Sequence, residues 1–314
     1  MNAMPLFDKK SVLQFLGTIP NETGLRRRAR FHQGWWRAFI LNEPEGANPV
    51  REKENVCNTI RGGEASGKNF LTPDAIWAIE ETKLERKEYE AGLFNEDRLF
   101  NNLLSSQPLA FNFFGPLKRD PGLAKALLGV FIPRITKVTG VLFEFAPKEN
   151  YSGDHSAFDV AIEFELGTKK GLLGLECKYT DTFSEKEYSK DSYRKIFDSS
   201  PNFLQPYEAY VSSRFNQLFR GQLIGESLVQ NRKYDFVLTG LFCFQDDSPA
   251  IETGRVFQGM LKGREDAFRI ISYAEFISAL QKLDLSWEVR EWSMLLWARY
   301  CGLKLSQDLF QKAN

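Results

Sequence analysis

The chain of 314 residues is poor in the side chains that soft-metal and redox sites require. It has only four cysteines and two histidines, and no two of the cysteines form a C-x-x-C pair. Three of the cysteines lie within apolar runs, so we expect buried thiols and neither a zinc site nor a disulfide framework. They are Cys57, Cys177, Cys243 and Cys301. Two histidines are also too few for a metal site built mainly from imidazole.

The sequence also lacks net charge and any long hydrophobic run. Its 41 acidic and 41 basic side chains cancel, so no global positive field attracts nucleic acid, and any contact with DNA must be local. No apolar stretch approaches the length of a bilayer span, and Met1–Pro5 lacks the basic and apolar regions of a signal peptide. We therefore expect a cytoplasmic protein without membrane contacts. The aromatic content of 14%, with 27 phenylalanines, indicates a substantial core.

What the sequence does contain is a strong hairpin signal over residues 156–180. In its first half, apolar residues alternate with Asp159 and two glutamates, the period of two that is typical of a strand with one buried face. A turn at residues 167–171 leads into a second apolar run, in which Glu176 and Lys178 lie on one side. Asp159, Glu176 and Lys178 are therefore predicted to converge at one end of a hairpin.

These three side chains suit the hydrolysis of a phosphodiester. The reaction needs a nucleophilic water, neutralisation of charge at phosphorus and stabilisation of the leaving oxygen. Hard oxygen ligands favour Mg²⁺, with Mn²⁺ as an alternative, and we expect Asp159, Glu176 and the backbone carbonyl of Cys177 to hold it. Lys178 would orient or help to deprotonate the attacking water and offset developing negative charge.

A purely structural interpretation of the same residues is a solvated strand face with a cross-strand ion pair. Such a pair contributes about 0 to 1 kcal/mol, and Glu-x-Lys alone is a weak signal. The second strand, however, contains Leu172, Leu173 and Leu175, which is typical of a strand buried on both faces. Glu and Lys are costly there unless they are paired or bound to a metal, so the context favours a functional site.

The spacing D-x16-E-x-K on two consecutive strands resembles the PD-(D/E)xK nuclease superfamily, which has the restriction-endonuclease-like fold. The residue before Asp159 is Phe158 and not proline, a departure that the family tolerates. The resemblance is greatest to prokaryotic restriction endonucleases. It implies an α/β fold in which a mixed central β-sheet is flanked by helices.

The predicted order of elements agrees with this resemblance over residues 94–245. A helix and a strand precede the hairpin, and a long helix and a further strand follow it. The predicted bounds are Pro121–Phe131, Lys137–Ala146, Phe203–Val229 and Tyr234–Phe244.

The resemblance implies two further site residues. Related nucleases often carry an acidic residue on a helix ahead of the first core strand, and Glu96 is the best-placed candidate. Its alternative role is to complement the dipole at a helix N-terminus. Several branches also place a glutamine beside the active lysine, which indicates Gln217. The alternative for Gln217 is a position on a polar, solvent-facing side of the helix.

The N-terminal part carries a basic and aromatic cluster from Arg26 to Arg37. Its arginines could contact phosphates while Trp35 and Trp36 stack on bases, or the whole cluster could anchor this part of the chain to the core. We expect residues 1–71 to form an N-terminal extension packed on the core. Residues 72–314 would then form the nuclease domain, including the C-terminal helices.

We therefore expect a Mg²⁺-dependent DNA endonuclease, with a restriction enzyme as the most specific form of that expectation. A double-strand cut with one active site per chain would need a homodimer. Two alternatives stay open. The first is a DNA-binding protein of the same fold without catalysis. The second is a small-molecule α/β hydrolase that uses the paired carboxylates together with a pocket that includes His155.

Overall fold

The centre of the fold is a five-stranded mixed sheet, as the sequence predicts. A computed structural model describes residues 9–47, 54–86, 95–154, 156–184 and 186–313. Strands β3, β4 and β5 pair antiparallel, whereas β6 and β7 run parallel to β5, in the spatial order β3-β4-β5-β6-β7. Their bounds are Lys137–Phe145, Phe158–Leu166, Lys169–Lys178, Phe236–Cys243 and Phe268–Ser272.

The predicted β4–β5 hairpin is present, but its turn is shorter than the predicted one at residues 167–171, because β5 already begins at Lys169. Leu166 pairs with Lys169 across a two-residue turn in which Gly167 has a φ of 64°, a left-handed conformation that glycine adopts without strain. Further along, a Cβ on Gly174 would lie 2.5 Å from the ring of Phe158. Phe158, which stands where related nucleases have proline, therefore packs its ring directly against the backbone of Gly174.

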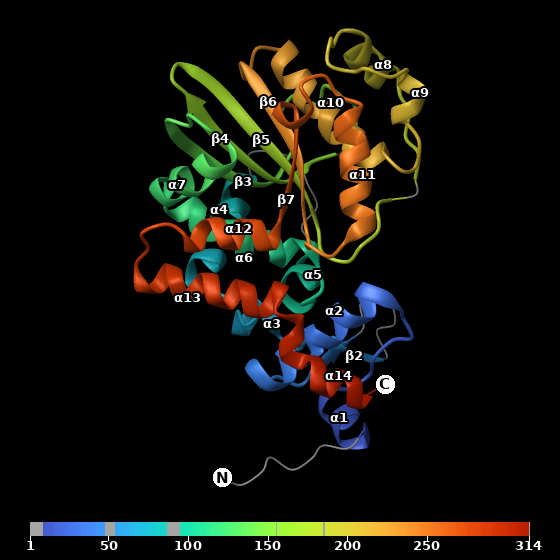
Figure 1. Cartoon of the computed structure of the whole chain (residues 1–314), viewed down its shortest axis with the longest axis vertical. Coiled ribbons are helices and arrows are strands. Elements are labelled where there is room, and N and C mark those ends of the chain that lie inside the picture. The colour runs from blue at the N-terminus through green and yellow to red at the C-terminus, as the bar shows by residue number, and fades with distance from the viewer. Residues whose placement is uncertain (1–8, 48–53, 87–94, 155, 185, 314) are drawn as a thin grey trace.

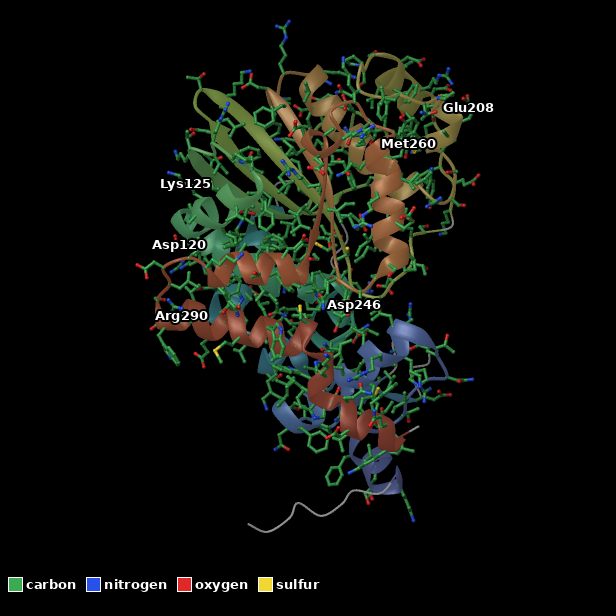
Figure 2. All side chains as sticks on the ribbon, in the orientation of Figure 1. Asp120, Lys125, Glu208, Asp246, Met260 and Arg290 are labelled. Carbon is green, nitrogen blue, oxygen red and sulfur yellow. The ribbon has the colours of Figure 1, made fainter. Side chains whose placement is uncertain are left out.

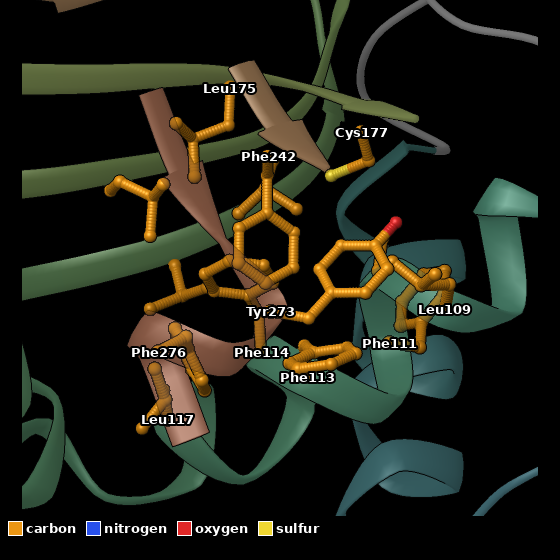
Figure 3. Packing of buried hydrophobic residues seen from close by; sticks show 14 of the residues in the cluster. Leu109, Phe111, Phe113, Phe114, Leu117, Leu175, Cys177, Phe242, Tyr273 and Phe276 are labelled. Carbon is orange, nitrogen blue, oxygen red and sulfur yellow. The ribbon is translucent and has the colours of Figure 1, made fainter. Parts of the chain in front are cut away.

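Helices cover both faces of the sheet (Figure 1). One face packs on α6 (Ser106–Arg119), α7 (Pro121–Phe131) and α12 (Tyr273–Gln281), and the other on α10 (Asn216–Gln230) and α11 (Ser248–Gly259). Figure 3 shows the aromatic centre of the first layer, where rings from α6, β6 and α12 meet. Phe113 lies 5.0 Å from both Phe242 and Tyr273 between ring centroids, a spacing typical of favourable aromatic pairs.

The long helix predicted at Phe203–Val229 is wrong in its first half. In a continuous α-helix, Phe203 and Phe219 would be about 24 Å apart along the axis, but their ring centroids are 5.6 Å apart. The chain folds back because rings of α9 (Tyr207–Tyr210) also pack on Phe219. Only α10 is a long helix, and the chain before it forms α8 (Asp191–Asp198) and α9.

The first and last of the described helices pack together below the sheet (Figure 1). The first helix, α1 (Lys9–Leu16), contacts the last, α14 (Gln307–Ala313), and α2 (Gly24–Trp35) contacts the turn at Leu303–Ser306. The other elements of this part are π-helices at Trp36–Ile40 and Trp297–Cys301, β1 (Glu45–Ala47), β2 (Asn55–Ile60) and α3 (Gly63–Ser66). Helices α4 (Pro73–Arg86), α5 (Glu96–Asn101) and α13 (Trp287–Leu296) connect it to the sheet.

A buried polar network ties the N-terminal helix α2 to the strand that carries the predicted lysine. Arg299, which is fully buried, donates to Gln33 Oε1 at 3.2 Å and to Asn69 O at 2.7 Å. Gln33 in turn donates to the hydroxyl of Tyr179, at 2.7 Å. Because Tyr179 follows Lys178 in the chain, this network fixes the end of β5 to α2.

Acidic and basic side chains are interspersed on the surface. Figure 2 shows acidic and basic side chains over all parts of the ribbon, among them Asp120, Lys125 and Arg290. Among the helices formed by the described residues, none combines the length and hydrophobicity needed to cross a bilayer.

The buried His32 makes the stability of the contact between α2 and the C-terminal part of the chain depend on pH. Its ring nitrogens lie 2.9 Å from Ser306 Oγ and 2.9 Å from Ala298 O. Burial, together with the positive charges of Arg28 and Arg299, lowers the pKa of His32 to about 4, although the carbonyl of Ala298 partly opposes this shift. The neutral ring is therefore the folded form.

We predict that this histidine makes the fold lose stability as the pH falls. The unfolded chain binds the proton below about pH 6.5 and the folded chain only below about pH 4, so stability is complete above 6.5 and declines through that window. Between pH 7 and pH 5, wild type should lose about 2 kcal/mol more free energy of unfolding than His32→Gln, measured in urea. An equal loss in both proteins would contradict the burial of a neutral histidine.

Candidate active site

The predicted acid pair and lysine lie together at one end of the sheet. Asp159 is the second residue of β4, and Glu176 and Lys178 are at the end of β5. Gln217, the second residue of α10, joins them. All four line a cleft of about 1100 Å³ between the sheet and the N-terminal part of the chain. The hairpin pattern therefore predicted which side chains meet.

Direct hydrogen bonds connect three of these side chains. The amide of Gln217 donates from Nε2 to Glu176 Oε1 at 2.6 Å and accepts at Oε1 from Lys178 Nζ at 2.8 Å. Lys178 Nζ also lies 3.2 Å from Glu176 Oε1. Because a carboxylate can only accept and an ammonium can only donate, the glutamine amide has one orientation that satisfies both.

Lys178 is held in a nearly water-free position. The residue is 7% exposed, and its ammonium lies 5.1 Å from the ring centroid of Phe183. The hydroxyl of Tyr273 donates to the backbone oxygen of Lys178 at 2.5 Å, which fixes the strand end from the core side. A buried ammonium requires compensation by acceptors, and Glu176 and Gln217 supply it.

Asp159 accepts a hydrogen bond from the backbone N–H of Cys177, from N to Oδ2, at 2.6 Å. The pairing of β4 with β5 ends at Val160 and Leu175, so Cys177 lies beyond the ladder. The N–H and C=O of one strand residue point to the same edge, which directs the Cys177 carbonyl toward the Asp159 side. Its thiol instead lies in the core beside Tyr273 (Figure 3). The contact of Cys177 with Asp159 is therefore made by its backbone N–H and not by its thiol.

Glu144 is a third acid at the site, and the sequence analysis missed it. It lies near the end of β3, between the pairs Phe143–Val160 and Phe145–Phe158, which places it beside Asp159. Its φ of 48° is unusual for a residue other than glycine, and Gln107 Nε2 donates to its carboxylate at 3.1 Å. The only sequence feature that could have indicated Glu144 is its position as a single acid between Phe143 and Phe145.

The site carries more negative charge than the protein around it compensates. Burial, followed by the neighbouring charges of Glu176 and Glu144, raises the pKa of Asp159 well above its ordinary value. The Cys177 N–H and Lys178 act in the opposite direction but do not cancel the shift. A cation between the acids would relieve this repulsion.

The donor set fits a hard divalent cation that keeps several water ligands. Asp159 and Glu176 offer carboxylate oxygens and Cys177 a carbonyl, which are the ligand types that Mg²⁺ prefers. Within the part of the chain that the structure describes, no group of three or more His, Cys, Asp or Glu side chains is arranged to hold a metal ion. A cation here would take its other ligands from water and substrate.

The structure does not bring Glu96 to this site. Glu96 is the first residue of α5, and its side chain is 59% exposed and lies 3.2 Å from Lys83 Nζ. It is absent from the described residues that line the cleft. A catalytic role for Glu96 stays a prediction from the resemblance, without a contact that supports it. His155 lies outside the described residues.

The N-terminal arginine cluster divides into two groups. Arg28 donates to Ser306 Oγ at 2.9 Å, and the buried Arg37 donates to the backbone oxygen of Cys57 at 2.8 Å, so both join segments of the fold. Trp36 is buried as well. Arg26 and Arg30 instead line the cleft. The prediction of packing is therefore confirmed for Arg28, Arg37 and Trp36.

A mixed sheet with an acid pair and a lysine at the ends of two adjacent strands, and a glutamine on the helix beside them, is the arrangement that the PD-(D/E)xK pattern implies. A family model described as the PD-(D/E)XK nuclease superfamily matches residues 20–302, and the chain belongs to that superfamily. Nucleases of this superfamily typically use divalent metal ions. The match extends beyond residues 94–245 on both sides and includes most of the predicted N-terminal extension. Searches of curated proteins and of solved structures gave no significant match.

We predict that Asp159→Asn stabilises the metal-free protein. The folded chain binds a proton at Asp159 more tightly than the unfolded chain, so this residue lowers stability as pH rises from about 4 through its folded pKa. In EDTA at pH 7.5, the Tm of the variant should exceed that of wild type by at least about 2 °C. The difference should shrink toward pH 4. A lower Tm for the variant at pH 7.5 would show that the carboxylate is compensated.

Proposed function

We propose that the protein is a metal-dependent endonuclease that hydrolyses phosphodiester bonds in DNA. The observation that carries the proposal is the junction of Lys178, Glu176 and Gln217 beside Asp159 in one cleft. These are the residues of the family pattern, and they retain the hydrogen bonds that orient a working site. A restriction enzyme acting in the cytoplasm is the most specific form of the proposal.

Asp159, Glu176 and the backbone carbonyl of Cys177 would hold the ion, with Mg²⁺ preferred and Mn²⁺ as the alternative. When bound, the ion would lower the pKa of a water and neutralise charge on the phosphate. The carboxylates then become ligands, and the repulsion that raises the pKa of Asp159 is relieved.

Lys178 would act on the attacking water and on the charge that develops at phosphorus. Its ammonium is already desolvated and oriented, so little reorganisation is needed when the reaction begins. Gln217 is a positioning residue, because it contacts Lys178 and Glu176 at once and sets the distance between them. Glu144 would add negative charge that favours binding of a cation.

Substrate shape and oligomeric state belong to the proposal as well. The cleft that contains the site is about twice as large as the neighbouring cavity of about 540 Å³ that shares Asp159 and Glu176. Its extent along the N-terminal part suits a polymer better than a small molecule. A double-strand cut would require a homodimer, with one site for each strand.

We predict that Lys178→Met folds normally and cleaves DNA poorly. The methionine retains most of the packing under Phe183 but cannot stabilise the transition-state charge. The rate of Mg²⁺-dependent cleavage of a plasmid should fall about 100-fold or more, whereas DNA affinity should change little. Wild-type cleavage by the variant would make the lysine structural. Absence of cleavage by wild type, with DNA binding retained, would favour the inactive DNA-binding alternative, and absence of both would favour the small-molecule hydrolase.

We also predict that Glu144→Gln lowers the affinity for Mg²⁺, whereas Glu96→Gln does not. Removing the charge at Glu144 leaves fewer anions near Asp159, so half-maximal cleavage should need about threefold to tenfold more Mg²⁺. Glu96 contacts Lys83 outside the cleft, and its variant should match wild type within about twofold. A Mg²⁺ titration of both variants checks this. The reverse result would return the catalytic role to Glu96.

A further inference from the structure

Two arginines line the active-site cleft from α2 and share a single carboxylate. Arg26 and Arg30 are one helical turn apart, so both side chains leave the helix on the same side. Glu22, two residues before the helix, accepts from Arg30 Nε at 2.6 Å, Arg30 Nη2 at 2.7 Å and Arg26 Nε at 2.9 Å. All three residues line the cleft that contains Asp159 and Lys178.

The geometry around Glu22 is the one that arginines use for either a carboxylate or a phosphate. Two parallel N–H donors from Arg30 reach the two oxygens of one anion, and Arg26 adds a third donor. Burial opposes the charge of Glu22, but the hydrogen bonds from Arg30 and Arg26 outweigh it and lower the pKa of this carboxyl. Glu22 is therefore a carboxylate anion bound by the N–H donors of Arg26 and Arg30.

Arg30 is oriented by groups other than Glu22. Its remaining nitrogen, Nη1, donates to Asn58 Oδ1 at 2.5 Å, and Asn58 Nδ2 donates to Asn102 Oδ1 at 2.8 Å. Asn58 is 1% exposed, and the Arg30 side chain is 11% exposed. The guanidinium would keep its orientation if the carboxylate moved away. Arg26 is 43% exposed and also pairs with Asp181 at 3.3 Å, three residues after Lys178.

Acidic side chains outnumber basic ones in the cleft, so Arg26 and Arg30 are important for any binding of an anion there. Six carboxylates and four cationic side chains are present among the described residues that line it. The acids are Glu22, Glu54, Glu144, Asp159, Glu176 and Asp181, and the bases are Arg26, Arg30, Arg98 and Lys178. An excess of acids repels a phosphate backbone, and displacement of Glu22 would leave the two guanidiniums with only the Asp181 carboxylate, which lies beside Arg26.

We infer that Arg26 and Arg30 form a subsite for a backbone phosphate of duplex DNA, and that the Glu22 carboxylate occupies this subsite in the free protein. The inference rests on the proposed nuclease function for the identity of the ligand. DNA would displace Glu22 and take over the same N–H donors, with Arg30 held ready by Asn58. Glu22 thereby competes with other anions, and only an anion that accepts from several N–H groups of Arg26 and Arg30 at once would displace it.

The test measures binding apart from cleavage, with a fluorescent DNA duplex in EDTA at low salt. Glu22→Gln should bind about threefold to tenfold more tightly, because a neutral amide competes poorly for the arginines. Arg30→Gln should bind about tenfold more weakly, and the slope of log affinity against log salt should flatten by about 0.9 for the lost phosphate contact. In the double variant, the gain from Glu22→Gln should disappear, since no arginine pair remains for the phosphate to occupy.

Arg290→Gln is the matched control. Arg290 is exposed on α13, outside the residues that line the cleft (Figure 2), and its loss removes the same charge. Its affinity and salt slope should equal those of wild type. If Arg30→Gln has a lowered Tm, the more exposed Arg26→Gln provides the same test, with a smaller loss of affinity and the same flattening of the slope.

Unchanged or weaker binding by Glu22→Gln would overturn the role of Glu22 as an occupant, and an intact salt slope in both arginine variants would overturn the phosphate subsite. A different result would show that the proposed nuclease function is wrong. The binding changes would then appear as expected while wild type with Mg²⁺ left the duplex uncut. The inference fails alone if wild type cuts DNA and none of the three substitutions at Glu22, Arg26 and Arg30 changes binding.

Discussion

The repulsion among carboxylates at the end of the hairpin is the constraint on which the rest of the site depends. Asp159 is placed beside Glu176 and Glu144 at a partly buried position in the cleft, and burial together with these charges raises its pKa. Proteins seldom keep such an arrangement for stability, because paired like charges in a poorly solvated site lower it. The local compensation is incomplete: Lys178 and Gln217 serve Glu176, whereas Asp159 has one backbone N–H. A cation bound between these acids, as proposed, would relieve the repulsion, and the cost in stability would then contribute to affinity for metal.

The fold holds this unfavourable cluster in place from two directions. On the core side, Tyr273 packs with Phe113 and Phe242 and bonds the backbone of Lys178. On the other side, the buried network through Gln33 fixes Tyr179, the next residue along β5. The strand end is thereby clamped between the aromatic core and the N-terminal helix α2. The family match includes this N-terminal part, which also supplies one wall of the cleft.

Much of the sheet and half of the site follow from the sequence alone. Period-two alternation predicts the hairpin, and with it the meeting of Asp159, Glu176 and Lys178, although the predicted turn is three residues too long. Gln217 required the resemblance, because a helical glutamine has no local signal. Glu144 could not be found without the register of β3, and Glu22 without the path of the chain before α2, since both depend on contacts between distant segments. The predicted helix from Phe203 failed for a related reason: aromatic packing on Phe219 overrides local helical propensity.

The central claim is that Asp159 and Glu176 hold one divalent cation in the folded protein. A crystal structure of the chain grown with Mn²⁺, with anomalous diffraction recorded at the manganese edge, tests it most directly. We expect one anomalous peak about 2.1 Å from a carboxylate oxygen of each residue and from the Cys177 carbonyl, with Asp159 turned from the Cys177 N–H toward the ion. A manganese peak elsewhere, with Asp159 and Glu176 in the contacts described above, would contradict it.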